Sequence, residues 1–370
     1  MRIKRIELSD YRNYESVDLR PSGNAVIVSG ENAVGKTNLL ESIYICAVGK
    51  SPRINLDKNL IRWGCDHFYI KITVQKKYRD HTIEVYLDEK NKKKIAVNGL
   101  PLTKMGELMG VLNVIYFSPD ELKLVKASPA ERRRFMDISL CQQNPSYYFA
   151  LSRYNKILAQ RNKLLKSGLS ARELNETLPL WDKQMASEGA IIAKQRYDYI
   201  CSLATSAADY NDKISNGDGV LRVGYESQVF SVKCESVEQF FLDKLAKARA
   251  KDIESACSSV GIQHDDVKIF LGDTDLRKFG SQGQQRTAVL SIKLAEIDAM
   301  TQRTGEKPVL LLDDVLSELD EGRVKALMRA VKSAQTFITC TEYDVNDESE
   351  TVGSQTILST NGKINLLYKE

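Results

Sequence analysis

An octapeptide near the N-terminus has the residue types and the spacing of a phosphate-binding loop. It reads Gly30-Glu31-Asn32-Ala33-Val34-Gly35-Lys36-Thr37 and matches the pattern G-x-x-x-x-G-K-[ST]. Its glycines let backbone N–H groups turn inward around a β-phosphate, Lys36 can reach the β and γ oxygens, and Thr37 can ligate Mg²⁺. The loop therefore predicts binding of ATP and Mg²⁺, with nucleotide contacts from Gly30, Asn32, Gly35, Lys36, Thr37 and Asn38.

The residues on either side of the loop predict the two elements that must position it. AVIVS at 25–29 is a short, apolar, β-branched run, and NLLESIY at 38–44 has the apolar spacing of a helix. The alternative is a glycine-rich turn that only starts a helix. The order strand, loop, helix favours the nucleotide site.

A second candidate site lies near the C-terminal end of the chain. PVLLLDD at 308–314 predicts a fully buried parallel strand that ends in two acids. Asp313 is placed to hold Mg²⁺ through water, and Asp314 to orient the attacking water. An acidic helix cap would explain one aspartate but explains two poorly. We therefore predict that Lys36, Asp313 and Asp314 are catalytic and that Thr37 and Asp313 hold the metal.

A third motif lies between these two. FGSQGQQR at 279–286 precedes TAVLSIKLAEIDAM, which has helical apolar spacing. A Ser-x-Gly-Gln that opens a helix is another anion-facing N-terminus. One nucleotide rarely needs two of these, so we expect Ser281, Gly283 and Gln284 to face the γ-phosphate held by a second copy. This predicts an ATP-dependent homodimer with Ser281, Gln282 and Gly283 in its interface.

Most of the chain separates Lys36 from Asp313, so a segment must leave the sheet and return. Apolar spacing predicts long helices over 147–165 and 180–210, with a break beginning at Ser167-Gly168. Helices of twenty to thirty residues would span about 30 to 45 Å, which excludes long coiled coils. We predict an α/β P-loop ATPase head, a mixed sheet with flanking helices, from residues 1–120 and 215–370. Residues 121–214 would form a smaller inserted helical arm, and 356–368 a hairpin.

Composition narrows the class of protein. The 370 residues are 42% apolar and 28% charged, as in an ordinary folded protein, without an unbroken apolar run or signal peptide, so we expect a cytoplasmic protein with no membrane partner. Seven scattered cysteines and three histidines argue against disulfides, zinc sites and a Ser-His-Asp triad. The net charge of +4 is too small to indicate a polyanion partner by itself.

Two local clusters of basic residues are candidates for contacting DNA phosphates. One is Arg132-Arg133-Arg134, and the other is the run Lys90, Lys92, Lys93, Lys94 beside Asn98-Gly99 on a probable hairpin. A local excess of cations is what phosphate contact needs, with no special spacing. Solvated surface is the alternative, and from the residues alone it is the stronger interpretation. The candidates for DNA contact are Arg132, Arg133, Arg134, Lys92 and Lys93.

Together these motifs resemble the ATPase heads of the ABC type and, in detail, the RecF family of bacterial recombination mediators. The resemblance runs nearly end to end, and FGSQGQQR joined to LLLDDVLSELD is its most specific part. The sequence departs from the family pattern at two places. Ala33-Val34 stands where the family usually has a glycine and a polar residue, and Gln263-His264 stands where it usually has His-Arg. The other resembling stretches are YRNY at 11–14, GENAVGKTNLLESIY, FSPDEL at 117–122 and SPAERRRFMD at 128–137.

The resemblance implies roles for further residues. Arg12 and Asn13 would contact ATP, and a surface turn is the equally weighted alternative. Ser317 and Asp320 would contact the opposite subunit, although a plain helix cap also uses serine there. Thr341-Glu342 occupies the place where transporter heads have a histidine, and no catalytic role is assigned to it. Arg53 resembles an arginine that couples DNA to ATP in related heads, with a structural ion pair as the alternative.

The resemblance also implies a function. The chain would be a weak, DNA-dependent ATPase whose head dimer closes on ATP, binds duplex DNA and single-strand/double-strand junctions at gaps, and helps load RecA together with RecR. Asp314 is one methylene shorter than the usual glutamate, so hydrolysis would be slow and would reset the dimer. The alternative is an ABC-type ATPase subunit coupled to a membrane or nuclease partner.

Overall fold

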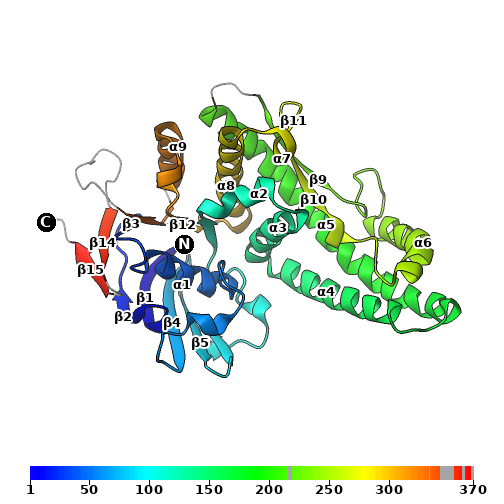
Figure 1. Cartoon of the computed structure of the whole chain (residues 1–370), viewed down its shortest axis with the longest axis horizontal. Helices are drawn as coiled ribbons and strands as arrows, with labels where there is room; N and C mark the ends of the chain where they lie inside the picture. Colours follow the sequence, from blue (N-terminus) through cyan, green and yellow to red (C-terminus); the bar gives the residue numbers. More distant parts are fainter. Residues whose placement is uncertain (216–218, 333, 342–353, 361–362, 368–370) are drawn as a thin grey trace.

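The computed structural model describes residues 1–215, 219–332, 334–341, 354–360 and 363–367, and Figure 1 shows the whole chain. Two six-stranded sheets lie on one side of the molecule and a bundle of long helices on the other. The first sheet is antiparallel, with order β2-β1-β4-β5-β6-β7. Its strands are β1 (Arg2–Tyr11), β2 (Tyr14–Leu19), β4 (His67–Gln75), β5 (Asp80–Asp88), β6 (Lys93–Val97) and β7 (Leu100–Pro101).

The second sheet carries the predicted chemistry at one edge. Its order is β15-β14-β3-β13-β12-β8, and all neighbours are parallel except the β14–β15 pair. The carboxyl ends of parallel strands meet at one edge of a sheet, so the residues after β3 and β12 are brought together. The strands are β3 (Ala25–Ser29), β8 (Val114–Phe117), β12 (Val309–Asp313), β13 (Thr336–Cys340), β14 (Ser354–Thr360) and β15 (Lys363–Leu367).

Strand β12 is buried along its whole length, which explains its unbroken apolar sequence. Val309 and Leu311 belong to the same apolar cluster as Leu39 and Leu40 of helix α1 (Lys36–Val48). The alternate residues Leu310 and Leu312 pack with Leu294 of α8 (Gln282–Thr304) and Leu327 of α9 (Glu321–Val331). The sheet is therefore covered on both faces, as the prediction of a mixed sheet with flanking helices requires.

The helical part is built around one helix longer than predicted. Helix α5 (Ala171–Ile214) has 44 residues and spans about 66 Å. Ser170 and Glu173 form a capping box that starts it before the predicted residue 180, and Pro179 is accommodated within it. It packs against α4 (Pro145–Leu165), α6 (Val237–Ser255) and α8, so its second half is tied to the sheet-bearing side. In the part of the chain that the structure describes, no helix meets the length and apolarity needed to span a bilayer.

Residues 221–275 add no strand to either of the six-stranded sheets. Strand β9 (Leu221–Glu226) pairs with β10 (Asp266–Leu271), which also pairs with β11 (Thr274–Asp275), in a separate three-stranded sheet. Phe241 of α6 lies against Gly189 of α5 and would be struck by any side chain there. The division into a head of 1–120 and 215–370 and an arm of 121–214 stays a prediction, although α6 packs with the arm helices.

The remaining elements are short, apart from α3 (Pro129–Gln143). The predicted C-terminal hairpin is present as the antiparallel pair β14–β15, while Asn361, Gly362 and Tyr368 lie outside the described residues. The short helices are α2 (Lys123–Lys126) and α7 (Leu276–Phe279), with 3₁₀ turns at Asp57–Leu60, Met105–Glu107, Pro119–Leu122, Ile262–His264 and Leu316–Glu318.

Buried ion pairs join the helices to one another and to Asp265, the residue before β10. Arg161 of α4 is fully buried and bonds Asp182 of α5 and Asp252 of α6, each across 2.8 Å. Arg196 of α5 bonds Asp137 of α3 at 2.9 Å and Asp265 at 2.8 Å. Removing one partner of such a pair leaves a buried charge without compensation, so these groups fix how the helices pack.

Candidate functional site

The phosphate-binding loop joins the end of β3 to the start of α1, as predicted. Gly35 is the N-cap of α1 at φ 110, a conformation that favours glycine, and a Cβ there would lie only 2.5 Å from the Asn13 side chain. Ala33 has φ 68, in the left-handed region, which is consistent with the glycine that the resemblance leads us to expect at this position. Lys36 is 8% exposed, and its Nζ donates to the carbonyl oxygens of Gly30 and Glu31, the latter at 3.0 Å. Its amino group is thus held at the loop.

The YRNY motif at 11–14, where β1 turns into β2, forms hydrogen bonds with the phosphate-binding loop. Asn13 Nδ2 donates to the Val34 carbonyl at 2.7 Å, and Asn38 Nδ2 donates to Asn13 Oδ1 at 2.9 Å. The hydroxyl of Tyr14 donates to the Gly35 carbonyl at 2.9 Å. These bonds place Asn13 and Asn38 at the loop, where both were predicted. Their contact with nucleotide stays a prediction.

Arg12 has a structural partner that sequence reasoning missed. Its Nε and Nη2 donate to the two carboxylate oxygens of Glu41, each at 2.9 Å, and Glu41 is fully buried in α1. Glu41 also accepts bonds from the hydroxyls of Tyr11 and Ser51. The Arg12 side chain is 19% exposed, so its main contact in this structure is the ion pair. Its predicted contact with ATP stays a prediction.

The carboxylate of Asp313 is the point where the P-loop meets the acidic strand. Thr37 Oγ1 donates to Asp313 Oδ1 at 2.7 Å, and Thr339 Oγ1 bonds the same oxygen at 3.0 Å. Tyr116 of β8 donates its hydroxyl to Oδ2 at 2.6 Å. Burial, together with the adjacent Asp313 carboxylate, raises the pKa of Tyr116 far above its ordinary value, so its phenol remains a donor. No local pattern in the sequence points to Tyr116 or Thr339.

Asp314 follows the strand in an unusual backbone conformation. Its φ is 53, in the left-handed region, where non-glycine residues are uncommon. The Asp314 N–H donates to Thr339 Oγ1 at 2.9 Å, and Ser317 Oγ donates to the Asp314 carbonyl at 2.9 Å. Thr339 therefore contacts both acids and sets the turn that follows β12.

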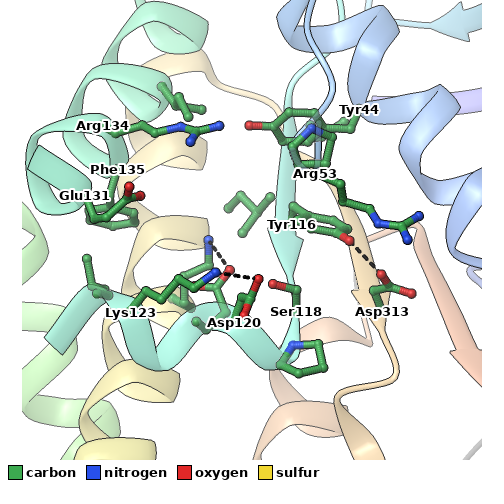
Figure 2. A pocket seen from close by; sticks show the side chains of 18 of the residues that line it. Tyr44, Arg53, Tyr116, Ser118, Asp120, Lys123, Glu131, Arg134, Phe135 and Asp313 are labelled. Carbon is green, nitrogen blue, oxygen red and sulfur yellow. Dashed lines mark hydrogen bonds and ion pairs between the residues drawn. The ribbon is translucent and has the colours of Figure 1, made fainter. Parts of the chain in front are cut away.

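Thr37, Asp313 and Asp314 line a cavity of about 770 Å³, which Figure 2 shows. Its other wall is formed by α2, α3 and α8, and Arg134 of α3 is directed across it toward Tyr44. Further lining residues include Arg53, Tyr116, Ser118, Asp120, Glu121, Lys123, Glu131, Phe135, Lys293 and Glu296. Arg53 Nη1 also donates to Asn38 Oδ1 at 3.2 Å, next to the phosphate-binding loop.

A buried charged cluster lies in the far wall of this cavity. Lys293 of α8 pairs with Glu296 at 2.9 Å and lies 3.8 Å from Glu121. Burial raises the pKa of Glu121 to about 7, and the nearby Lys293 opposes that rise. The Lys293 ammonium also lies over the rings of Phe117 and Phe135. The cluster ties α8, which begins at the S-x-G-Q motif, to the segment that follows β8.

The S-x-G-Q motif lies at the start of α8, as predicted. Ser281 is the N-cap, its Oγ accepting from the Gln284 N–H at 3.2 Å while Gln284 Oε1 accepts from the Ser281 N–H at 3.0 Å. Ser281 and Gln282 are exposed. Among the described residues, the lining of the 770 Å³ cavity contains Thr37 and Asp313 but none of residues 281–284. The motif thus caps its own helix and faces outward.

The other predicted interface residues lie beside this motif. Asp320 is the N-cap of α9 and accepts from the Arg323 N–H at 3.0 Å, and Ser317 is exposed. Arg323 also donates to the Gly283 carbonyl at 3.1 Å and to Thr287 Oγ1 at 2.8 Å. Arg323, to which no sequence motif points, therefore joins the two segments into one surface. Glu342, from the predicted Thr341-Glu342 pair, lies outside the described residues.

The structure separates the members of the arginine cluster. Arg132 is 2% exposed and pairs with Asp266 at 2.6 Å, so the prediction that it contacts DNA does not fit its position. Arg133 is partly buried and donates to the Asp265 carbonyl at 2.8 Å. Arg134 is exposed and lines the cavity. Adjacent helical residues point in different directions, which a run of three arginines does not reveal.

The lysine cluster divides in the same way. Lys93 Nζ donates to Asp57 Oδ2 at 2.8 Å and to the Gly49 carbonyl at 2.7 Å. Its ammonium group therefore binds other parts of the protein, which does not fit the predicted contact with DNA. Lys90, Lys92 and Lys94 are exposed. Lys58, also exposed, lies with Lys90 on a groove of about 400 Å³ between the Asp57–Leu60 turn and the β5–β6 loop. We call Lys58, Lys90, Lys92 and Lys94 the lysine surface.

The oxygen donors at the end of β12 fit Mg²⁺ better than a transition metal. Thr37 and Asp313 supply a hydroxyl and a carboxylate 2.7 Å apart. Among the described residues there is no group of three or more His, Cys, Asp or Glu placed to hold a metal. Mg²⁺ usually takes only one or two protein oxygens and completes its shell with water and phosphate, which matches this set.

The fold and the site define a class of protein. A parallel sheet with a phosphate-binding loop and an Asp-Asp strand end, joined to an antiparallel sheet and to a helix opened by S-x-G-Q, is an ABC-type ATPase head of the SMC kind. A solved Smc head bound to the C-terminal winged-helix domain of ScpA has this fold, with a TM-score of 0.56 at 16% identity over 99% of this chain and 97% of that one.

The family follows from closer matches. The model of the "RecF/RecN/SMC N terminal domain" matches residues 2–362. The DNA replication and repair protein RecF of Clostridium botulinum is 41% identical over 98% of this chain and 99% of its own, and that of Agathobacter rectalis is 41% identical over 93% of both. A solved "recombination mediator protein RecF-ATP in RecFOR pathway" superimposes with a TM-score of 0.89 at 32% identity, over 99% of this chain and 97% of that one. The chain belongs to the RecF family of DNA replication and repair proteins.

Proposed function

We propose that this chain is an ATP-gated DNA-binding protein of recombinational repair. Two heads would close on two molecules of ATP, bind duplex DNA and single-strand/double-strand junctions at gaps, and open again after slow hydrolysis. Family membership supports a cytoplasmic, nucleoid-associated role in which the protein helps RecR load RecA. The alternative, an ATPase subunit coupled to a membrane or nuclease partner, has no such support, because the relatives are DNA replication and repair proteins.

One observation carries the proposal. Thr37 of the P-loop and the two acids line one cavity, whereas Ser281 and Gln282 are exposed at the start of α8 and Gly283 lies beside them, away from that cavity. The N-terminus of a helix carries partial positive charge, which attracts anionic oxygens. A second head placed against this surface would bring Ser281 to the triphosphate held by the first. Arg323 and Asp320 would extend the same contact.

Each residue of the site would have a separate role in ATP hydrolysis. Lys36, held at the loop carbonyls, would move its ammonium onto the β and γ oxygens. Thr37 and Asp313 would hold Mg²⁺, which supplies charge neutralisation at the phosphates when bound. Asp314 would orient the attacking water. Its side chain is short and its backbone is fixed by Thr339, so water would be held less closely than by a glutamate and turnover would be slow.

The lysine surface is the best-supported place for duplex DNA. All four lysines are exposed, Lys58 and Lys90 line one groove together with Asp57 and Glu89, and the Lys93–Asp57 ion pair connects the two segments that carry them. Duplex DNA carries one negative charge about every 1.7 Å, so a surface with several exposed ammonium groups can bind it without reading sequence. Arg134 is a separate, weaker candidate because its side chain points into the cavity.

The test is light scattering of the purified full-length chain with no nucleotide, ADP or ATP, each repeated with gapped duplex DNA. We expect a monomer that becomes a dimer with ATP, and DNA affinity that rises in parallel. A protein that remains monomeric at saturating ATP, or binds DNA equally with and without ATP, would contradict the proposal.

A further inference from the structure

Tyr116 occupies a position that the ATPase chemistry above leaves unused. Its hydroxyl donates to Oδ2 of Asp313 at 2.6 Å, and Figure 2 shows this bond at the edge of the cavity. The other oxygen, Oδ1, receives the hydroxyls of Thr37 at 2.7 Å and Thr339 at 3.0 Å. The carboxylate is therefore held from both sides by neutral hydroxyl groups.

The sheet explains how these groups meet. Strand β12 lies between β8 and β13, with Leu311 opposite Tyr116 and Asp313 opposite Thr339. Side chains two residues apart on a strand share one face, so Tyr116 lies diagonally next to Asp313 on the face covered by α1. The ring of Tyr116 packs against Tyr44 of α1, with centroids 5.6 Å apart. Both the ring and the hydroxyl are thus fixed.

We propose that Tyr116 is a positioning residue for the divalent cation that accompanies the nucleotide. It would hold Asp313 Oδ2 in place so that the carboxylate meets the cation's water shell in one orientation. This inference rests on the proposed function, because it concerns the same Mg²⁺ site. Through Tyr116, strand β8 would help to position a metal site whose other residues come from the P-loop and β12.

Loss of the Tyr116 hydroxyl would change cation binding in two opposite ways. Removing the phenol leaves more negative charge on Asp313, which attracts a cation more strongly, but it also frees the carboxylate to rotate. Groups that orient a metal-binding carboxylate typically change metal affinity or activity by about 10- to 100-fold when mutated. Orientation therefore dominates, and loss of the hydroxyl weakens cation binding.

The test compares Tyr116→Phe with Tyr44→Phe in the full chain. Each removes one hydroxyl from the same cavity and keeps the ring, so packing is preserved. Mn²⁺ binding is measured by electron paramagnetic resonance in the presence of ATPγS, and the half-saturating Mg²⁺ concentration is measured for ATP-driven dimerisation and for hydrolysis. We expect Tyr116→Phe to weaken Mn²⁺ binding and raise the Mg²⁺ requirement about tenfold, with dimerisation and turnover restored by excess Mg²⁺. Tyr44→Phe should match the wild type.

The outcomes separate this inference from the proposed function. If the wild type binds Mn²⁺ with ATPγS and Tyr116→Phe binds it equally or more tightly, the inference is overturned. If Tyr116→Phe loses turnover that excess Mg²⁺ does not restore, its role is structural and the inference is again overturned. If the wild type itself shows no cation-dependent nucleotide binding, the proposed function fails first.

Discussion

The hydroxyl of Thr37 donates to Oδ1 of Asp313 across 2.7 Å, although 276 positions separate the two residues. Thr37 lies in the first turn of α1, the helix after β3, and Asp313 ends β12, with β13 between the two strands. A parallel sheet brings these ends to one edge. The bond shows that the P-loop and the acidic strand form one site, and the following predictions depend on it.

Lys36→Ala should abolish ATP-driven dimerisation. The ammonium is the loop's cationic contact for β and γ oxygens, and methyl cannot replace it. Light scattering with and without ATP measures the effect, with Lys163→Ala on the surface of α4 as the matched control. A Lys36→Ala protein that still dimerises at the wild-type ATP concentration would show that the lysine is not needed for closure.

Ser281→Arg should leave ATP binding by the monomer intact and prevent dimerisation, because the bulky cation would occupy the surface facing the second head. Loss of the N-cap alone costs about 1 kcal/mol. Ser236→Arg is the control, since Ser236 caps α6 through the same bond, its Oγ accepting from the Gln239 N–H at 3.2 Å. Fluorescent-ATP titration and light scattering separate the two properties. Weaker ATP affinity in the Ser281→Arg monomer would place the motif in its own chain's pocket.

Asp314→Asn should accumulate the closed, DNA-bound dimer. Asparagine tolerates the left-handed φ of 53 at this position at least as well as aspartate, so folding should be unaffected. Only the carboxylate that orients water is lost, which slows hydrolysis without removing ATP. The lifetime of the ATP-bound dimer on gapped DNA measures this, with the exposed Asp273→Asn as control. A dimer that opens at the wild-type rate argues against a role for Asp314 in hydrolysis.

Lys92→Gln combined with Lys94→Gln should weaken DNA binding and reduce its salt dependence. Each lost phosphate contact lowers the slope of log affinity against log salt by about 0.9, so the pair should lower it by about 2. Fluorescence anisotropy between low and moderate salt gives the slope. Lys163→Gln with Lys166→Gln, two exposed lysines at the far end of α4, provides equal charge loss elsewhere. An unchanged slope in the first variant would remove the lysine surface from the DNA interface.

Arg132→Ala should destabilise the protein instead of acting on DNA. The guanidinium is buried against Asp266, and removing one partner of a buried pair typically costs about 3 to 5 kcal/mol. The melting temperature should fall clearly, whereas Arg134→Ala, at an exposed neighbour, should change it little. If Arg132→Ala kept the wild-type melting temperature and lost DNA binding, its assignment as a structural residue would be wrong.

Local patterns in the sequence were enough to predict the elements of the site. The apolar run 25–29, the loop at 30–37 and the helix after it are encoded by adjacent residues, and the structure has β3, the loop and α1 in those places. The same holds for β12 and α8. These signals are reliable because strand and helix periodicity and glycine turns depend on neighbours in the chain. The extent of α5 was underestimated because Ser170 starts it well before its strongest apolar repeat.

The roles of individual charged and hydroxyl groups were decided only by the tertiary structure. Arg132 and Arg134 are indistinguishable in sequence, but Asp266, 134 positions away, meets the first and leaves the second exposed. Lys93 forms an ion pair with Asp57, whereas its neighbour Lys92 is exposed. Tyr116 becomes part of the site only because β8 lies next to β12. Burial and pairing depend on which distant segments the fold brings together, and no local pattern contains that information.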